Sequence, residues 1–251
     1  MCLQNSANLF KPNATYIITG GFGGIGLALS RWMCKKGARH IVLTSRRGCH
    51  NAAGRRTLAF LKSQGVTVYE FAGDLSDESF VQTMIAKLNH SSSIPPIRGV
   101  FHLAGIIKEA DNFLHLLPDQ LQLMLGSKAR GAQYLHDHTL DQPLDVFMLM
   151  SSLVTVWGNP VQPSYCAANS FLDALALQRY SLGLPALSLQ LGAVRGAGFL
   201  EDKIDDTRRL ADKGTSTLHI DEILSVLGKL LVSCDQPVVC LANQVGNLSL
   251  T

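Results

Sequence analysis

The chain has 251 residues, of which 47% are apolar, 16% charged and 7% aromatic, and its 22 basic and 19 acidic side chains give a net charge of +3. This composition excludes a disordered chain, because charge is well below the usual value of about 25% and apolar residues are plentiful. It fits one large domain with a two-sided core. No basic block stands out, which argues against nucleic acid as a partner.

No run of about 18 apolar residues occurs anywhere, so no membrane span is expected. The first residues, MCLQNSANLFKPN, lack the pattern of a secretory signal peptide. Six cysteines are scattered without the paired spacing of a zinc site or a disulfide framework. These features predict a cytoplasmic protein with reduced thiols and no bound metal.

Apolar runs alternate with amphipathic segments along the chain. Strands are predicted over residues 15–20, 40–46, 67–74, 98–105, 145–152, 185–192 and 237–242, and helices near 24–36, 52–64, 76–90, 118–138, 163–182 and 219–233. This order predicts an α/β fold, a Rossmann-type doubly wound parallel seven-stranded sheet with helices on both faces. Residues 1–14 are interpreted as an N-terminal linker and 15–251 as a single domain. Two irregular segments, 106–116 and 193–216, follow strand ends, where open α/β sheets bind ligands.

A glycine-rich turn joins the first predicted strand to the first helix. Glycines permit a tight turn and bring backbone N–H groups and a helix N-terminus close to a pyrophosphate. In this position the turn predicts a dinucleotide-binding loop made by Gly20, Gly21, Phe22, Gly23, Gly24, Ile25 and Gly26.

The ends of the next strands indicate which dinucleotide binds. Ser45 and Arg46 follow the second strand, where an NAD site usually has a carboxylate and an arginine suits the 2′-phosphate of NADPH. NADPH is therefore the predicted cofactor. Further cofactor contacts are predicted from the ends of the third and fourth strands, at Asp74, Leu75, Ala104 and Gly105.

The most specific pattern surrounds the fifth predicted strand. Ser152 ends that strand, Tyr165 follows thirteen residues later, and Asn169 lies one helical turn beyond the tyrosine. Lys128 lies on the preceding helix. A phenol has a pKa near 10 and donates a proton efficiently only when its anion is stabilised, which a neighbouring ammonium does. Ser151 competes with Ser152, but the spacing and the strand alternation favour Ser152.

With these residues the chain resembles a short-chain dehydrogenase/reductase, and more narrowly the ketoreductase domain of a type I polyketide synthase or animal-type fatty acid synthase. The segments that carry the resemblance are TGGFGGIGLALSRWMCKKGARHIVLTSRRG, GDLSD, GVFHLAG, SSLVTVWGNPVQPSYCAANSFLDALA and LGAVRGAGFL. Common short-chain reductases carry lysine four residues after the tyrosine and asparagine on the earlier helix. Here Lys128 and Asn169 are exchanged, as in these ketoreductases.

The resemblance implies NADPH-dependent reduction of a β-ketoacyl thioester to the β-hydroxyacyl thioester. In it, Tyr165 donates a proton to the ketone oxygen, Ser152 polarises that oxygen, Lys128 lowers the tyrosine pKa and Asn169 helps hold a proton-relay water. The nicotinamide is expected near Gly192, Ala193 and Val194. The substrate is expected to be tethered through phosphopantetheine to an acyl carrier protein.

The resemblance also has a consequence for domain organisation. Family members pair the catalytic half with a preceding, structural reductase-like half. This chain is therefore expected to be a catalytic subdomain beside other synthase domains, with an exposed apolar edge where the structural half docks.

The sequence departs from part of the family pattern. The Leu-Asp-Asp signature of one stereochemical class is missing from residues 106–111, whereas Trp157 and Gln162 resemble the class associated with L-configured alcohols. Leu191 stands where the family often has tryptophan. Among the histidines, His102 is interpreted as a core residue rather than a base, and His136 as a surface residue at a helix end.

Two alternatives from other classes stay open. One is a free-standing carbonyl reductase that acts on small untethered ketones. The other is an NADPH-binding module that is inactive and serves as a structural support. The presence of Lys128, Ser152, Tyr165 and Asn169 argues against the second, because a support has no physical need for that set.

Overall fold

Seven parallel strands form the central sheet of this protein. The computed structural model describes residues 8–105, 118–159, 162–197 and 217–242. The sheet order is β3-β2-β1-β4-β5-β6-β9, in which β1 and β4 flank the point where the strand order reverses, the usual ligand site of such sheets. The strands are β1 (Thr15–Thr19), β2 (His40–Ser45), β3 (Thr67–Ala72), β4 (Ile97–His102), β5 (Val146–Ser152), β6 (Leu187–Leu191) and β9 (Val238–Leu241).

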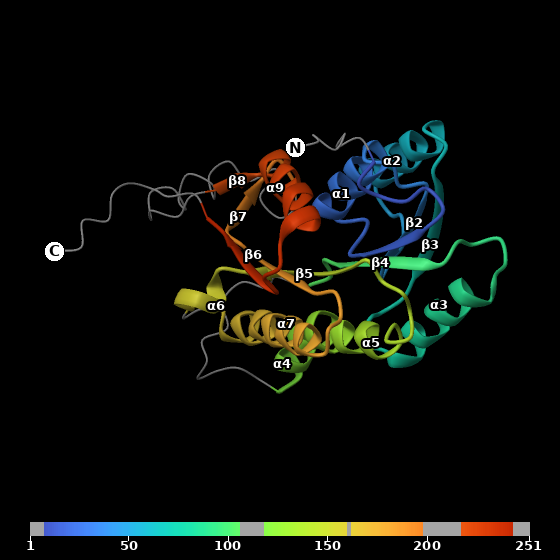
Figure 1. Cartoon of the computed structure of the whole chain (residues 1–251). Helices are drawn as coiled ribbons and strands as arrows, with labels where there is room; N and C mark the ends of the chain where they lie inside the picture. Colours follow the sequence, from blue (N-terminus) through green and yellow to red (C-terminus); the bar gives the residue numbers. More distant parts are fainter. Residues whose placement is uncertain (1–7, 106–117, 160–161, 198–216, 243–251) are drawn as a thin grey trace.

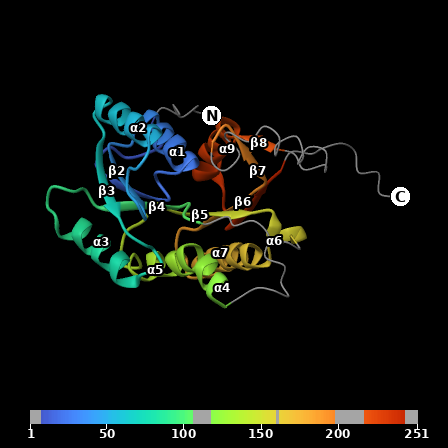
Figure 2. The same cartoon turned by 180° about the vertical axis from the view of Figure 1, so that it is seen from behind.

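Helices cover both faces of the sheet (Figures 1 and 2). One face carries α1 (Gly24–Lys35), α2 (Ala52–Ser63) and α9 (Ile220–Ser233). The other carries α3 (Glu78–His90), α4 (Pro118–Leu125), a π-helical turn labelled η2 (Gly126–Arg130), α5 (Gly131–Asp137) and α7 (Pro163–Ser181). Within the described part of the chain, no helix is both long and apolar enough to cross a membrane.

Alternation along β1 shows why the sheet needs both layers. Ile17 packs into the apolar cluster under α3, α5 and α7, whereas its neighbours Tyr16 and Ile18 pack into the cluster under α1 and α9. All three side chains are at most 2% exposed. Because successive strand residues point to opposite faces, a strand covered on both sides is apolar throughout. The predicted doubly wound, seven-stranded parallel sheet is confirmed.

Three local features differ from the predicted elements. The segment 193–216, expected to be irregular, begins with β7 (Ala193–Arg195), which pairs in parallel with β8 (Thr217–His219) in a separate two-stranded sheet. A short helix, α6 (Val154–Trp157), follows β5. The helix predicted over 118–138 is interrupted by η2. Elements of three to five residues are too short for a periodic pattern to reveal. Residues 106–117 and 198–216 lie outside the described part.

Residues 8–14, interpreted above as part of a linker, include two side chains that are buried in the domain, those of Phe10 and Ala14. Phe10 is only 3% exposed, and its ring makes edge contacts with Tyr16, Trp32 and Phe101 at centroid distances of 5.0, 5.5 and 6.0 Å. One aromatic residue carries no periodicity, which is why the pattern did not reveal this contact.

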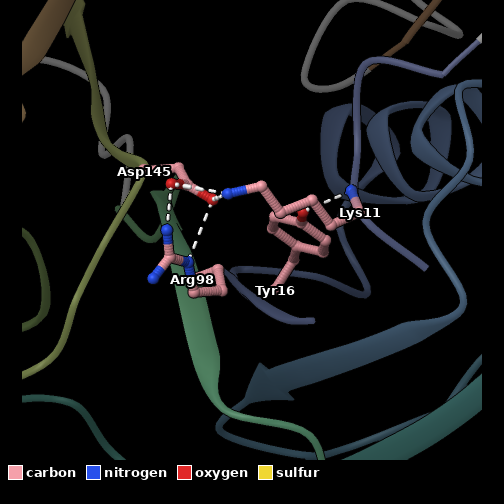
Figure 3. A network of polar contacts seen from close by, with 4 residues as sticks. All are labelled: Lys11, Tyr16, Arg98 and Asp145. Carbon is pink, nitrogen blue, oxygen red and sulfur yellow. Dashed lines mark hydrogen bonds and ion pairs between the residues drawn. The ribbon is translucent and has the colours of Figure 1, made fainter. Parts of the chain in front are cut away.

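Polar contacts also hold this segment to the sheet (Figure 3). The Lys11 backbone N–H donates to the Tyr16 hydroxyl at 2.8 Å, and the Lys11 ammonium lies 2.9 Å from Asp145. Arg98 donates to both oxygens of the same carboxylate. Because Arg98 and Asp145 stand at the starts of β4 and β5, this network lies at the amino ends of the strands, away from the edge where the predicted site residues gather.

Candidate active site

The glycine turn lies at the carboxyl end of β1, in direct contact with the residues that follow β4. Gly20 has a φ of +63°, and a Cβ there would meet the backbone nitrogen of Ala104 at 3.1 Å. A Cβ on Gly26 would come within 2.6 Å of the Gly20 carbonyl oxygen. Both positions therefore require glycine. Gly23 is the N-cap of α1 and provides no side-chain cap. The N–H groups of the first turn can therefore donate hydrogen bonds to an anion.

Other residues of this turn shape it without offering a side chain to a ligand. The Gly21 N–H donates to the Thr44 carbonyl oxygen at 3.0 Å, which fixes the turn against β2. Phe22 is 2% exposed and belongs to the core. Gly24 and Ile25 form the start of α1, and Ile25 packs against the same core. Any contact of Phe22 with a nucleotide would therefore be through its backbone.

The end of β2 presents an exposed arginine. Ser45 is half-buried and donates to the Gly48 carbonyl oxygen at 3.3 Å, which closes the turn that follows. Arg46 and Arg47 are both exposed. The Arg47 guanidinium lies 3.1 Å from His50 Nε2. No polar partner is recorded for the Arg46 side chain among the described residues, so its guanidinium is available to a phosphate group.

The predicted contacts after β3 and β4 differ in what they can offer. One oxygen of Asp74 accepts from the Ser76 N–H at 2.9 Å, and the residue is half-buried. Leu75 is 3% exposed and packs in the core, which removes its side chain as a cofactor contact. Gly105 lies beside the candidate catalytic lysine, since a Cβ there would be 3.5 Å from Lys128 Nζ.

Lys128 lies in the π-helical turn η2 and is 5% exposed. Its ammonium donates to the Met150 carbonyl oxygen at 2.8 Å, which brings it to the end of β5. Burial lowers the pKa of Lys128 from 10.5 to about 8, and the negative charge of Asp173 opposes that fall. π-Helical turns are frequent at functional sites.

The two serines at the end of β5 have different surroundings. Ser151 donates to the backbone carbonyl oxygen of Asn169 at 3.3 Å, so its hydroxyl ties β5 to α7. The Ser152 hydroxyl accepts from the Val154 N–H at 3.4 Å, a long contact that leaves its proton available. Ser152 approaches the Tyr165 phenol, which supports its choice over Ser151.

Tyr165 lies in the first turn of α7, near Ser152 and Asn169. Burial raises the pKa of Tyr165, and the nearby side chains of Ser152 and Asn169 oppose this rise by favouring the anion. The Lys128 ammonium lies 5.6 Å from the centre of the Tyr165 ring. Asn169 is fully buried, and its Nδ2 donates to the Tyr165 carbonyl oxygen at 2.7 Å, whereas its Oδ1 has no hydrogen-bond partner among the residues that the structure describes. The structure thus gathers all four predicted catalytic residues.

A polar network behind the site was not predicted from the sequence. Asp173 accepts from the Ser188 hydroxyl at 2.5 Å and from Gln190 Nε2 at 2.8 Å. Gln190 also donates to the Thr155 hydroxyl at 2.8 Å, and Thr155 donates to the Ser152 carbonyl oxygen at 3.0 Å. Helical spacing could have revealed Asp173, because it lies four residues after Asn169 and eight after Tyr165, on one face of α7.

The predicted stereocontrol and nicotinamide residues border this region. Trp157 ends α6 and is 64% exposed. Gln162 is the N-cap of α7, and its Oε1 accepts from Asn159 Nδ2 at 3.0 Å. Gly192 follows β6 and Val194 lies in β7, and both are half-buried.

Comparisons with known proteins agree with this arrangement. The family described as KR domain matches residues 14–196. The reducing polyketide synthase PKS1 of Cochliobolus heterostrophus is 38% identical over 197 residues, which are 78% of this chain and 8% of that protein. The phenolphthiocerol synthesis polyketide synthase type I Pks15/1 of Mycobacterium marinum is 35% identical over 94% of this chain and 12% of its own length.

Solved structures of ketoreductases have the same fold. An A1-type ketoreductase superposes with a TM-score of 0.85 at 33% identity, covering 96% of this chain and 50% of that one. An A-type ketoreductase from a modular polyketide synthase gives a TM-score of 0.84 at 33% identity with the same coverage. The chain thus spans half of these structures and about a tenth of the curated relatives named above. It belongs to the KR domain family, the short-chain dehydrogenase/reductase-type ketoreductases of polyketide synthases.

Proposed function

We propose that this domain reduces a β-ketoacyl thioester, tethered to an acyl carrier protein, to the β-hydroxyacyl thioester with NADPH. The observation that carries the proposal is the convergence of Lys128, Ser152, Tyr165 and Asn169 at the carboxyl ends of the strands, beside the glycine turn. Membership of a ketoreductase family adds support, because such domains reduce β-keto groups.

The residues present fit a dinucleotide with a 2′-phosphate. Gly20 and Gly26 pack against neighbouring backbone where no Cβ would fit, so the backbone of the turn is accessible to a pyrophosphate. The turn lies next to the start of α1, which has no side-chain cap. The exposed Arg46 guanidinium at the end of β2 suits the 2′-phosphate, and the same place holds no carboxylate for the ribose of NAD. Among the described residues one oxygen of Asp74 is hydrogen-bonded, which leaves the other for the adenine amino group, and Gly192 and Val194 would border the nicotinamide.

The proposed proton donor is Tyr165. Burial keeps its phenol protonated at neutral pH, so it can donate to the ketone oxygen as negative charge develops there. Ser152 would donate a second hydrogen bond to the same oxygen. NADPH, when bound, supplies the hydride that adds to the keto carbon.

Lys128 and Asn169 are proposed to sustain that proton transfer. The Lys128 ammonium lies within reach of the tyrosine ring and favours the phenolate left after donation. Asn169 presents a buried Oδ1 that has no hydrogen-bond partner in the described part of the chain, and this acceptor suits a relay water that returns a proton to Tyr165.

The relatives support a proposed setting for the reaction. They are large synthases, so neighbouring synthase domains are expected, among them a structural reductase-like half. The proposed partner is a carrier protein whose phosphopantetheine arm delivers the substrate, in the cytoplasm. Trp157 and Gln162 favour an L-configured alcohol, which chiral analysis of the product tests.

The decisive experiment is single-turnover NADPH oxidation with a short series of β-ketoacyl thioesters, on a carrier protein and as small-molecule mimics. Tyr165→Phe should bind NADPH normally and lose about 100-fold or more in rate, because the proton donor is gone. Full activity of this variant contradicts the proposed role. Equal rates with free ketones favour a stand-alone carbonyl reductase, and NADPH binding without oxidation favours an inactive module.

A further inference from the structure

His102, the last residue of β4, is completely buried, and both of its ring nitrogens form hydrogen bonds. Its Nδ1 lies 2.8 Å from the Thr19 hydroxyl, and its Nε2 lies 2.8 Å from the Lys128 carbonyl oxygen. Thr19 is its direct partner in the register of β1 and β4. The interpretation of His102 as a satisfied core residue is thus confirmed, but its two partners belong to functional segments.

The hydrogen bonds that link Leu103 and Ala104, Thr19, His102 and Lys128 fix where the protons lie. The Thr19 hydroxyl oxygen accepts from the backbone N–H groups of Leu103 and Ala104, at 3.1 and 3.2 Å. The Leu103 N–H is shared with the Thr19 backbone carbonyl oxygen, at 3.3 Å. The Lys128 carbonyl oxygen can only accept, so His102 Nε2 carries the ring hydrogen and donates it there. In the neutral ring Nδ1 is then an acceptor and takes the Thr19 hydroxyl proton.

Both ends of this row of hydrogen bonds lie at the candidate site. Leu103 and Ala104 begin the edge against which Gly20 packs, so closely that a Cβ added to Gly20 would lie 3.1 Å from their backbone atoms. Lys128 lies in η2, whose carbonyl oxygens accept in a non-standard pattern: the Gly131 N–H donates to Gly126 and Lys128. The His102 ring thus supplies a tertiary hydrogen bond to the centre of the π-helical turn.

We propose that His102 is a positioning residue that holds the cofactor edge after β4 and the Lys128 turn at a fixed separation. The proposal rests on the proposed function, since it assigns a purpose to the position of Lys128. It requires a neutral ring with the hydrogen on Nε2. Burial and, next, the positive charge of Lys128 lower the pKa of His102 to about 3, so the ring is neutral under ordinary conditions.

Other titratable groups around Lys128 must be accounted for in a test. The negative charge of Asp173, in α7, opposes the fall in the pKa of Lys128. Tyr165, also in α7, lies close to the Lys128 ammonium. Among the described residues, neither Asp173 nor Tyr165 forms a hydrogen bond with His102. Loss of the His102 ring should therefore act on Lys128 by releasing its turn rather than by removing a charge.

The matched variants are His102→Leu and His136→Leu. His136 was interpreted as a surface residue, but it is 4% exposed and hydrogen-bonded to Arg179 at 2.8 Å, because α7 covers this end of α5. It lies away from the glycine turn and the tyrosine, and its loss should lower stability without changing the site. It therefore controls for the general cost of removing a buried imidazole.

Three measurements test the proposal: single-turnover rate against pH, NADPH affinity by fluorescence, and the pKa of Lys128 from 13Cε-lysine NMR. In His102→Leu the rate should fall about tenfold or more, as for a misplaced catalytic group. NADPH affinity should weaken, and the pKa of Lys128 should rise from about 8 toward its ordinary value as the released ammonium gains water. His136→Leu should change none of these. Equal effects of the two variants overturn the proposal.

A measurement on the wild-type protein keeps the proposal testable even if a variant fails to fold. 15N-histidine NMR should show His102 neutral from pH 5 to 8 with its hydrogen on Nε2. Hydrogen on Nδ1, or titration near pH 6.5, overturns the proposal. Failure of the proposed function has a different signature, which is absence of NADPH oxidation by the wild-type protein. The histidine spectrum and the Lys128 pKa are readable without turnover and decide the positioning role separately.

Discussion

The Lys128 ammonium lies 5.6 Å from the centre of the Tyr165 ring while it donates a 2.8 Å hydrogen bond to the Met150 carbonyl oxygen. One bond therefore fixes the cation to the end of β5, the strand that also carries Ser152. Among the described residues the ammonium makes no other hydrogen bond, so its remaining donors can favour the tyrosine anion.

Ketone reduction should lose rate above about pH 8. Burial lowers the pKa of Lys128 to about 8, so the ammonium is charged below this pH and neutral above it. Neutral lysine no longer stabilises the phenolate, and proton donation slows. Lys128→Met should lower the single-turnover rate by about 100-fold and remove this alkaline limb. Lys87→Met, at an exposed site on α3, is the control and should keep the limb. A limb that persists in Lys128→Met would belong to another group.

Asp173→Asn should move the same limb to lower pH. The Asp173 carboxylate raises the pKa of Lys128, so removing its charge makes the ammonium easier to deprotonate. Ser188→Ala is the matched control, because it removes the 2.5 Å hydrogen bond to Asp173 but keeps the charge. Rate against pH for both variants separates the charge from the hydrogen bond. A similar shift in the two variants would show that packing, not charge, controls Lys128.

Arg46→Ala should weaken NADPH binding by about tenfold or more and leave NADH binding nearly unchanged. The expected loss is that of a charge-assisted hydrogen bond to a phosphate, and NADH has no 2′-phosphate. Arg47→Ala is the matched control, since Arg47 is equally exposed but lies 3.1 Å from His50 Nε2. Fluorescence titration with both cofactors measures the effect. If Arg47→Ala causes the larger loss, the 2′-phosphate contact belongs to Arg47 instead.

Local sequence signals predicted most of the sheet and the four candidate catalytic residues. The strands were visible because both faces of the sheet are covered, which makes them apolar throughout. Lys128, Ser152, Tyr165 and Asn169 were visible because two of them share a helical face and one ends a strand. Asp173 was not predicted, although it shares one face of α7 with Tyr165 and Asn169. The contacts of His102 with Thr19 and Lys128 were not predicted because they join residues distant in sequence. The π-helical turn at Lys128 was not predicted either, because its sequence, GSKAR, carries no local signal for such a turn.

The last prediction concerns the segment before β1, which the sequence pattern described as a linker. Phe10 is buried among three aromatic rings, and Phe10→Ala should lower the free energy of unfolding by about 3–5 kcal/mol. Lys11→Ala should cost only about 0–1 kcal/mol, because the Lys11 side chain is 56% exposed and its ion pair with Asp145 is screened by water (Figure 3). Urea unfolding measures both. The folded fraction of each variant should keep the wild-type single-turnover rate, because this segment packs at the amino ends of the strands. A larger cost for Lys11→Ala than for Phe10→Ala would mean that the ion pairs, rather than the aromatic contacts, hold the segment in place.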